Sequence, residues 1–330
     1  MARFLVLDHC TVCTLLPFDE IIGLMEETFS ALGEGRAAQP LRSVSTIPGQ
    51  KAVIALMPGY VGSQPPALGV KALTVFPGNT GRGLDTHQGA VLLFSPDTGE
   101  LRAVINAGAV TARRTAAVSA LATRYLAREG ELTLVVIGAG RQGRAHLQAL
   151  GEVRPLREAL VVDREPEKAR ALAEDVDASL AFPVRAVESL REALAAADIV
   201  VTTTSSHEPI LRREWVRAGT HICAVGASRP PEQELDAETV AEASLFADRR
   251  ESLVHEAADY QEALRRGLIP GPAHIRAELA DLVLGRHPGR RSVEEVTVFR
   301  SMGLAIEDVA AAGYAFHRAV EQGEGCWVEV

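Results

Sequence analysis

Residues 132–150 read LTLVVIGAGRQGRAHLQAL and combine a branched apolar run, three glycines and an amphipathic segment. Leu132–Ile137 predicts a central parallel strand, because both faces of such a strand are buried. Gly138, Gly140 and Gly143 follow in G-x-G-x-x-G spacing, which allows a tight turn, a close backbone approach to a pyrophosphate and close packing of helix on strand. The helix expected next would direct its N–H groups and positive dipole end at the phosphates. This stretch therefore predicts a dinucleotide-binding unit.

A second apolar run, Ala159–Val162, predicts the neighbouring strand and ends at Asp163. Asp163 has the spacing from the glycines at which an acidic residue accepts hydrogen bonds from the ribose of NAD and repels the extra phosphate of NADP. It could equally cap the helix expected over EPEKARALAED (165–175). Arg164 adds an alternative, since a guanidinium there could receive a 2′-phosphate. We expect a Rossmann-type domain that binds NAD(H), with NADP(H) as the alternative.

The composition sets limits on domains and partners. The 330 residues, 47% of them hydrophobic, are enough for two domains with substantial cores. The net charge of −9 and the absence of a long basic run argue against nucleic acid as a partner. No apolar stretch reaches about 18 uncharged residues, and the start MARFLVLDHC lacks the pattern of a signal peptide. We expect no membrane partner and a cytoplasmic location.

The cysteines and the short charge clusters predict no site of their own. The four cysteines are too few for a disulfide scaffold, and the C-x-x-C of Cys10 and Cys13 has no second pair or His cluster to complete a metal site. We therefore expect buried thiols and no metal. The cluster DRRE (248–251) is expected to be solvated, and residues 248–267 are expected to form an amphipathic surface helix.

The chain divides into two regions that differ in their predicted secondary structure. In the region before the glycine-rich stretch we expect a helix over residues 18–32, and this helix is followed by an antiparallel sheet. An Ala-rich helix then leads into a region where strands and helices alternate, and a final helix at 303–322 falls outside that alternation. The strands are expected at about 52–57, 69–76, 89–94, 101–106, 199–203, 221–225 and 244–247, and the Ala-rich helix at 109–127. The expected fold is α/β, with a Rossmann-type parallel-sheet domain at 119–298 and an α+β domain at 1–118 and 299–330.

Three cations in the first region form a second candidate site. Lys71 lies inside the apolar strand GVKALTVF, where a buried ammonium would need an anionic partner. Arg42 follows AAQPL, and Arg114 lies on the Ala-rich helix. The planar fork of Arg suits a carboxylate. Each could also be an ordinary surface charge, because the sequence does not show whether the three converge.

Four segments of the chain resemble the ornithine cyclodeaminase and mu-crystallin family. They are THQGAVLLF (86–94), TARRTAAVSALATRYL (111–126), EPILRREWVRAGTHICAVGASRP (208–230) and TVFRSMGLAIEDVAAA (297–312). The resemblance extends from about residue 18 to the last helix. It implies a homodimer in which the first domains join their sheets, with substrate binding in that domain and NAD(H) or NADP(H) in the Rossmann domain. It also implies that Arg42, Lys71 and Arg114 hold the carboxylate of an amino or cyclic imino acid near the nicotinamide.

The same resemblance implies a set of cofactor contacts. Without it, a lone His such as His87 before a strand is more often structural than functional. The implied contacts are Thr86, His87, Arg114, Gly138, Ala139, Gly140, Arg141, Gln142, Gly143, Asp163, Arg164, Thr203, Val225, Ser301 and Met302.

One position departs from the cyclodeaminase pattern. Members that cyclise ornithine carry an Asp in a G-A-D-x-P-G-K-like loop, and the aligned residue here is Ser228, in GASRPPEQEL (226–235). The lysine and glycine of that loop are replaced by Glu232 and Pro231. Serine cannot supply a carboxylate base. The loop is similar to the GASRP form of the mu-crystallin, ketimine reductase branch, which places Ser228 at the substrate.

We therefore expect hydride transfer to the C=N carbon of Δ1-pyrroline-2-carboxylate or Δ1-piperideine-2-carboxylate, giving L-proline or L-pipecolate. Lys71 would anchor the substrate and assist its protonation, while Arg42 and Arg114 would neutralise its carboxylate. Three alternatives stay open. They are ornithine cyclodeamination to L-proline and ammonia, an amino acid dehydrogenase of the alanine type, and a non-catalytic protein that binds a small molecule such as an iodothyronine.

Overall fold

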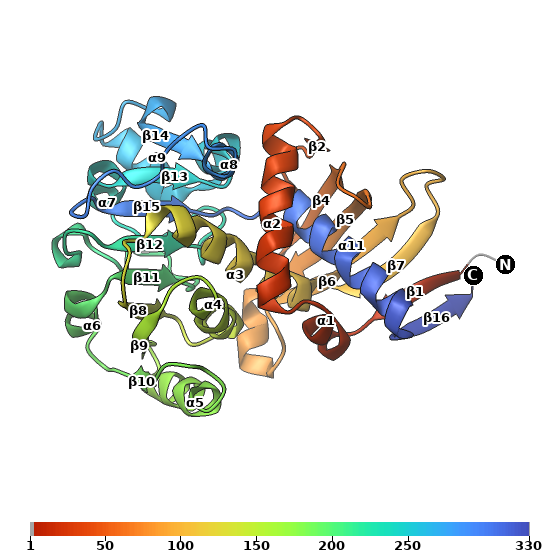
Figure 1. Cartoon of the computed structure of the whole chain (residues 1–330), viewed down its shortest axis with the longest axis horizontal. Coiled ribbons are helices and arrows are strands. Elements are labelled where there is room, and N and C mark those ends of the chain that lie inside the picture. The colour runs from red at the N-terminus through yellow and green to blue at the C-terminus, as the bar shows by residue number, and fades with distance from the viewer. Residues whose placement is uncertain (1–2, 330) are drawn as a thin grey trace. The chain divides into compact units, whose positions relative to one another are not determined.

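The computed structural model describes residues 3–329, except for the side chains at positions 80 and 81. The chain forms two compact units (Figure 1). The first comprises Met1–Arg114 and Leu304–Val330, and the second comprises Thr115–Gly303. Helix α3 (Ala107–Leu126) carries the chain from the first unit into the second. No helix of the described part combines the length and apolarity that a membrane crossing requires.

The first unit is built on an eight-stranded sheet in the order β16-β1-β7-β6-β5-β4-β2, with β3 also paired to β4. The strands are β1 (Arg3–Leu7), β2 (Ala37–Ala38), β3 (Ser43–Thr46), β4 (Val53–Val61), β5 (Ala67–Val75), β6 (His87–Phe94), β7 (Leu101–Asn106) and β16 (Cys326–Glu329). Apart from the parallel pair β1 and β7, neighbouring strands are antiparallel. The expected antiparallel sheet is therefore present, and β1, β2, β3 and β16 are strands that the sequence pattern did not predict.

Helices cover one face of this sheet. They are α1 (His9–Leu15), α2 (Phe18–Gly33) and α11 (Ala305–Gln322), and the short helix η1 (Pro77–Arg82) follows β5. Helix α11 lies on β4 and β5 (Figure 1), as expected of a final helix that packs back on the first region. A Cβ on Gly59 of β4 would come within 3.2 Å of Ala305, so glycine is what lets the helix approach the sheet so closely.

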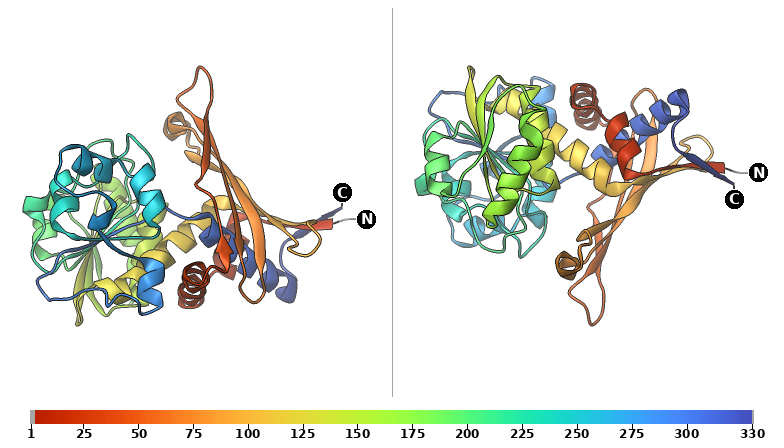
Figure 2. Two further views of the ribbon diagram at one scale, coloured as in Figure 1. Left: turned by 90° about the horizontal axis from the view of Figure 1, so that it is seen from above. Right: turned by 90° about the horizontal axis from the view of Figure 1, so that it is seen from below.

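The second unit contains an all-parallel sheet in the order β10-β9-β8-β11-β12-β15-β13-β14, with helices on both of its faces (Figure 2). Its strands are β8 (Leu132–Ile137), β9 (Leu156–Val162), β10 (Val184–Ala186), β11 (Ile199–Thr202), β12 (His221–Ala224), β13 (Ser244–Ala247), β14 (Ile275–Glu278) and β15 (Thr297–Arg300). Its helices are α4 (Arg141–Gly151), α5 (Pro166–Asp177), α6 (Leu190–Ala196), α7 (Ala237–Glu242), α8 (Arg250–Glu256), α9 (Ala258–Arg265), α10 (Leu279–Val283), η2 (Arg213–Trp215) and η3 (Pro272–His274). The strand order reverses between β8 and β11, which is where open α/β sheets bind their ligands.

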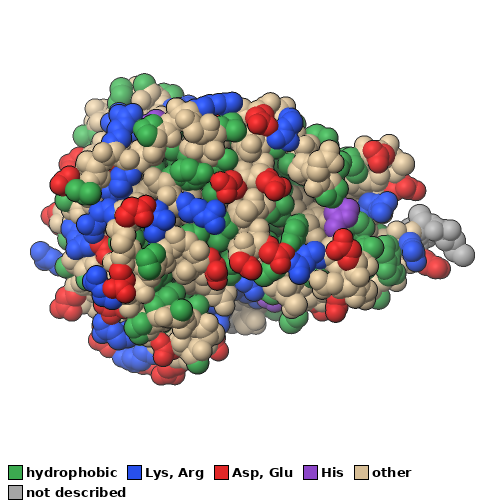
Figure 3. All heavy atoms as spheres, viewed as in Figure 1, with side chains coloured by type: hydrophobic (Ala, Val, Ile, Leu, Met, Phe, Trp, Pro, Cys, Tyr) green, Lys and Arg blue, Asp and Glu red, His purple; other side chains and the backbone are tan. Residues whose placement is uncertain are grey.

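Two expectations about exposure are wrong. Cys10 is exposed and Cys13 is partly exposed, because α1 turns Val12 and Leu15 to the core instead. Residues 248–267 form two short helices, α8 and α9, and Asp248 is fully buried instead of solvated. On the face shown in Figure 3, acidic and basic side chains are interspersed.

Candidate functional site

The glycine turn lies at the switch point of the parallel sheet. Gly138 has φ +110°, and a Cβ there would lie 2.7 Å from the hydroxyl of Thr203. A Cβ on Gly143 would lie 2.1 Å from the carbonyl oxygen of Gly138, so helix and turn touch directly. A Cβ on Gly140, the N-cap of α4, would meet nothing within 4 Å. Packing within the protein thus requires glycine at positions 138 and 143. Gly140 leaves open space at the N-terminus of α4, which fits a pyrophosphate.

Asp163 fixes the turn from the next strand. Its Oδ2 accepts a hydrogen bond of 2.7 Å from the Ala139 N–H, and its Oδ1 accepts one of 2.9 Å from the Glu165 N–H. On the other side of the turn, the Thr203 hydroxyl donates to the Gly138 carbonyl at 3.0 Å. Arg164, next to Asp163, is exposed. The structure therefore gathers the turn, Asp163 and Thr203 at the carboxyl ends of β8, β9 and β11. Arg141 and Gln142 lie beside them, in the first turn of α4.

A buried carboxylate that the sequence reasoning missed, Glu234, fastens the loops after β11 and β12. It accepts hydrogen bonds from the Thr204 N–H at 2.6 Å, from the Gly226 N–H at 2.8 Å and from the Thr202 hydroxyl at 2.8 Å. Burial raises the pKa of Glu234 above its usual value. Val225 directly precedes Gly226 in the loop after β12, so Glu234 holds the backbone next to it.

A second missed carboxylate, Asp248, holds the loop after β15. Its Oδ2 accepts hydrogen bonds from the Met302 N–H at 2.6 Å, the Gly303 N–H at 2.7 Å and the Ser301 hydroxyl at 3.2 Å. Asp248 follows directly on the apolar strand β13, just as Asp163 follows β9. Asp248 could therefore have been identified from the sequence by its position directly after an apolar strand.

Ser228 lies, half-buried, in the loop after β12. The side chain of Arg300 donates to the carbonyl oxygens of Ala224 and Ala227, and it pairs with Asp259 at 3.0 Å. The nearest acidic side chain along this loop, Glu232, lies 3.3 Å from Arg229. The loop thus presents a hydroxyl, and not a carboxylate, at position 228.

The first unit contains a buried charge cluster. The Lys71 Nζ lies 2.6 Å from Oδ2 of Asp308, and Arg114 reaches Oδ1 of Asp308 at 2.9 Å and Glu307 at 2.5 Å. Lys71 is only 4% exposed, and both carboxylates are fully buried. The period of two along β5 places Lys71 on the same face as Gly69, where α11 covers the sheet. Glu307 and Asp308 lie in the first turn of α11.

The protonation states in this cluster follow from burial and charge. Burial lowers the pKa of Lys71 to about 8, the charge of Asp308 acts in the opposite direction, and the charges of Arg114 and Arg42 lower it further. Burial raises the pKa of Asp308, but Arg114 and Lys71 outweigh this and leave it below its usual value. At neutral pH the pair is therefore ammonium and carboxylate. Arg42 is half-buried, directly before β3, and its charge is felt at Lys71.

The remaining predicted contacts of the first unit lie at the start of β6. The Thr86 hydroxyl lies 3.0 Å from Nδ1 of His87, and both side chains are accessible. The structure thus brings Lys71 and Arg114 together in the first unit. Their acidic partners were not predicted, because acidic residues in a first helical turn are usually explained by the helix dipole.

Comparison with known proteins agrees with this architecture. The model of the ornithine cyclodeaminase/mu-crystallin family matches residues 4–323, so the chain belongs to that family. It is 38% identical over 309 residues to the ketimine reductase mu-crystallin of Rattus norvegicus, with 93% of both chains covered. The Δ1-pyrroline-2-carboxylate reductase of Thermococcus litoralis, solved with NADH and L-proline, has 38% identity and a TM-score of 0.95, covering 99% of this chain and 100% of that one. An archaeal alanine dehydrogenase dimer with bound NAD has 32% identity and a TM-score of 0.92, with 99% of both chains covered. The expected family and the expected Rossmann-type α/β fold are confirmed.

Proposed function

We propose that this protein is an oxidoreductase that reduces a cyclic ketimine carboxylate with a nicotinamide cofactor. The substrate is Δ1-pyrroline-2-carboxylate or Δ1-piperideine-2-carboxylate, and the product is L-proline or L-pipecolate. The observation that carries the proposal is the buried pair of Lys71 and Asp308, bordered by Arg114. It occurs in a chain that resembles, over its whole length, a reductase solved with NADH and L-proline.

The second unit is the proposed cofactor domain. The open space at Gly140 accommodates a pyrophosphate, and Asp163, already oriented by the Ala139 N–H, is placed to accept from a ribose. Its negative charge favours NAD(H), while the exposed Arg164 keeps NADP(H) as the alternative. When bound, the reduced nicotinamide supplies the hydride that adds to the C=N carbon. The residues proposed to hold the cofactor are Thr86, His87, Arg114, Gly138, Ala139, Gly140, Arg141, Gln142, Gly143, Asp163, Arg164, Thr203, Val225, Ser301 and Met302.

The cationic side chains of the first unit suit an anionic substrate. The ammonium of Lys71 and the guanidinium of Arg114 are balanced by Glu307 and Asp308. Arg42 adds a third positive charge that acts on the same lysine. Three cationic side chains therefore act in the same part of the first unit, and guanidinium and ammonium groups suit the oxygens of a carboxylate. We propose that Arg42, Arg114 and Lys71 orient the substrate through its carboxylate, with Ser228 beside it.

Reduction of an imine needs a proton on nitrogen as well as a hydride on carbon. Lys71 is suited to donate that proton, because a pKa of about 8 keeps it charged at neutral pH and still allows it to release the proton. Asp308 positions the ammonium and holds its charge. Reprotonation of Lys71 from solvent completes the cycle. A strong general base is not required, since the imine carbon is already electrophilic.

Cyclodeamination of ornithine is the less favoured alternative. Position 228 carries a hydroxyl, and Glu232, the carboxylate nearest to it along the loop, lies beside Arg229.

We also propose a homodimer formed through the first unit. Alternate residues of β4 are exposed, and they include the large apolar side chains of Ile54, Leu56 and Tyr60. The buried alternates face α11, so the exposed set forms the opposite face of the sheet. Exposed apolar faces of this kind are typical of interfaces between protein chains. The related alanine dehydrogenase was solved as a dimer. The cytoplasmic location stays a prediction from the sequence.

The function is tested by following cofactor oxidation with each cyclic imine and each reduced cofactor in parallel. L-Ornithine and L-alanine, each with the oxidised cofactor, serve as competing substrates. We expect oxidation of NADH with at least one imine and formation of the corresponding cyclic amino acid. Release of ammonia from ornithine without imine reduction would instead select the cyclodeaminase.

A further inference from the structure

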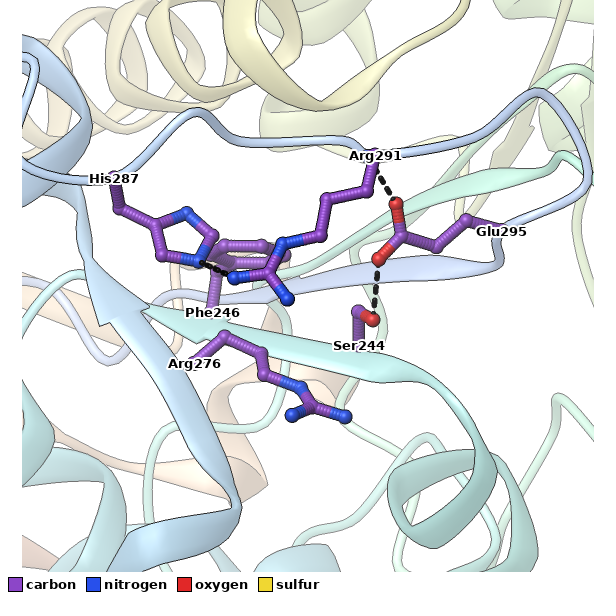
Figure 4. Close-up of a pocket in the computed structure, with 6 residues that line it drawn as sticks. All are labelled: Ser244, Phe246, Arg276, His287, Arg291 and Glu295. Carbon is purple, nitrogen blue, oxygen red and sulfur yellow. Dashed lines mark hydrogen bonds between the residues drawn. The ribbon is translucent and has the colours of Figure 1, made fainter.

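A small hollow lies at the edge of the second sheet away from the glycine turn. Its volume is about 70 Å³, and it is lined by Ser244, Phe246, Arg276, His287, Arg291 and Glu295 (Figure 4). Ser244 begins β13, Arg276 is the second residue of β14, and Glu295 comes shortly before β15. These strands are parallel to β8, so the hollow lies at their amino ends, whereas the glycine turn lies at the carboxyl end of β8. It is therefore separate from the proposed cofactor site.

The hollow contains more hydrogen-bond donors than acceptors. A guanidinium can only donate, and two of them, those of Arg276 and Arg291, line this space. Within residues 3–329, no hydrogen bond or ion pair joins the Arg276 side chain to another group. Among the described residues, the hydrogen-bond partner of the Arg291 guanidinium is the His287 ring, with Nη2 at 3.2 Å from Nε2.

His287 cannot satisfy both of its neighbours. The Gly289 N–H points at its Nδ1 at 3.1 Å, and the donor-only Nη2 of Arg291 points at its Nε2. A neutral imidazole has one accepting nitrogen and one N–H. One of these two contacts therefore sets a donor against a donor. Protonation would only add a further donor, and burial together with the charge of Arg291 holds the pKa of His287 below its usual value.

The single carboxylate in the hollow is already engaged. Glu295 accepts from the Ser244 hydroxyl at 2.5 Å through Oε1 and from the Arg291 N–H at 2.6 Å through Oε2 (Figure 4). What the hollow lacks is an acceptor that Arg276, Arg291 and His287 can share.

We propose that this hollow binds a small tetrahedral oxyanion of the phosphate class. The guanidiniums of Arg276 and Arg291 provide the charged donors, and once Arg291 turns to the anion, the ring N–H of His287 provides a third. Three donors converging from one strand and one loop suit several oxygens in a tetrahedron better than a planar carboxylate. The buried ring of Phe246 packs edge-on against His287 at 5.5 Å between centroids and holds it in place. This site is independent of the proposed reaction.

The test is calorimetric titration of the full chain with inorganic phosphate at constant ionic strength. Because the glycine turn can also bind phosphate, the comparison is between two double variants of equal charge. Arg276→Gln with Arg291→Gln removes the proposed donors, whereas Arg157→Gln with Arg170→Gln removes two exposed arginines elsewhere in the same unit. We expect each lost guanidinium of the site to weaken phosphate binding about tenfold, with no loss in the control.

A second readout locates the anion. The ¹⁵N signals of the His287 ring, assigned from their absence in His287→Asn, should move when phosphate is added to the wild type and stay in place in the Arg276/Arg291 variant. Wild-type affinity in that variant, or no phosphate binding by the wild type, would overturn the proposal. Neither measurement uses an imine. A negative result for phosphate therefore does not bear on the proposed reaction, and a failure of imine reduction does not bear on the phosphate site.

Discussion

The Nζ atom of Lys71 lies 2.6 Å from Oδ2 of Asp308, although one residue belongs to the central strand β5 and the other to the first turn of the last long helix, α11. Neither charge would be stable alone at this depth, because an unpaired buried ion is strongly disfavoured. The return of α11 to the first unit therefore makes a buried lysine possible. The proposed chemistry depends on this pairing.

Replacing Lys71 by Met should nearly abolish turnover. The substitution keeps the volume of the side chain but removes the proposed proton donor, a contribution worth about 10²- to 10⁴-fold in rate. Steady-state kinetics should show a fall in kcat of at least about a hundredfold. NADH binding, followed by its fluorescence, should be retained. The matched control is Lys51→Met at an exposed position, which should behave as wild type; equal activity of the two variants would remove Lys71 from the mechanism.

Asp308→Asn should change the pH dependence of the reaction. A proton donor with a pKa of about 8 makes kcat/KM fall as the pH rises through that value. The negative charge of Asp308 stabilises the ammonium, so its loss lowers the pKa of Lys71 and moves the falling limb to lower pH. Profiles between about pH 6 and pH 10 measure this shift. The exposed Asp97→Asn serves as control, and a limb at the same pH in all three proteins would contradict the assignment.

Asp163→Asn should relax the preference for NADH. The amide retains an oxygen for the Ala139 N–H but loses the charge that repels a 2′-phosphate. We expect the ratio of kcat/KM for NADPH to that for NADH to rise about tenfold or more. Glu174→Gln, an exposed change of the same kind on α5, should leave the ratio as it is. An unchanged ratio in Asp163→Asn would mean that this carboxylate does not face the ribose.

His146 should make the protein less stable in acid. It is buried between the Gln142 carbonyl and the Ser119 hydroxyl, and burial lowers its pKa to about 4. Below about pH 6.5 the His146 side chain is protonated in the unfolded chain but stays neutral in the folded chain. The free energy of unfolding therefore falls as the pH drops towards 4. One such group contributes up to about 1.4 kcal/mol per pH unit. The unfolding free energy of His146→Asn, measured in urea, should depend less steeply on pH by about this amount; parallel curves would refute the assignment.

The exposed apolar face of β4 should control assembly. Ile54→Asp combined with Leu56→Asp places two charges on the proposed dimer face, where burial would be costly. Light scattering should report a monomer for this variant and a dimer for the wild type. Leu264→Asp tests an equally exposed leucine of the second unit and should remain dimeric. A wild-type monomer, or a dimeric double variant, would exclude this interface.

The sequence predicted those elements whose signals are local. The strands at 101–106 and 244–247 and the start of α2 at Phe18 agree with the structure to the residue, because short apolar runs mark the strands and Asp19 and Glu20 mark the first turn of the helix. The strands β1 and β16 escaped prediction. They pair with each other across almost the full length of the chain, with Arg3 opposite Glu329, and β1 also pairs with β7, about a hundred residues away. Such pairing leaves no local pattern.

Only part of the candidate site was predictable from the sequence. The apolar neighbours of Lys71 indicated burial and the need for an anion, but they did not indicate which carboxylate. Asp308 gave no separate signal, since an acidic pair in a first helical turn is common. Asp248 was assigned to solvent because its neighbours are charged, although its position at the end of an apolar strand matches that of Asp163.

The most direct test of the central claim uses NADH deuterated at both C4 positions, with Δ1-pyrroline-2-carboxylate and Δ1-piperideine-2-carboxylate as acceptors. Mass spectrometry of the product should find L-proline or L-pipecolate carrying one deuterium on the carbon that bears the carboxylate, and Lys71→Met should form it at least about a hundredfold more slowly. Failure to find labelled product from either imine would contradict the account.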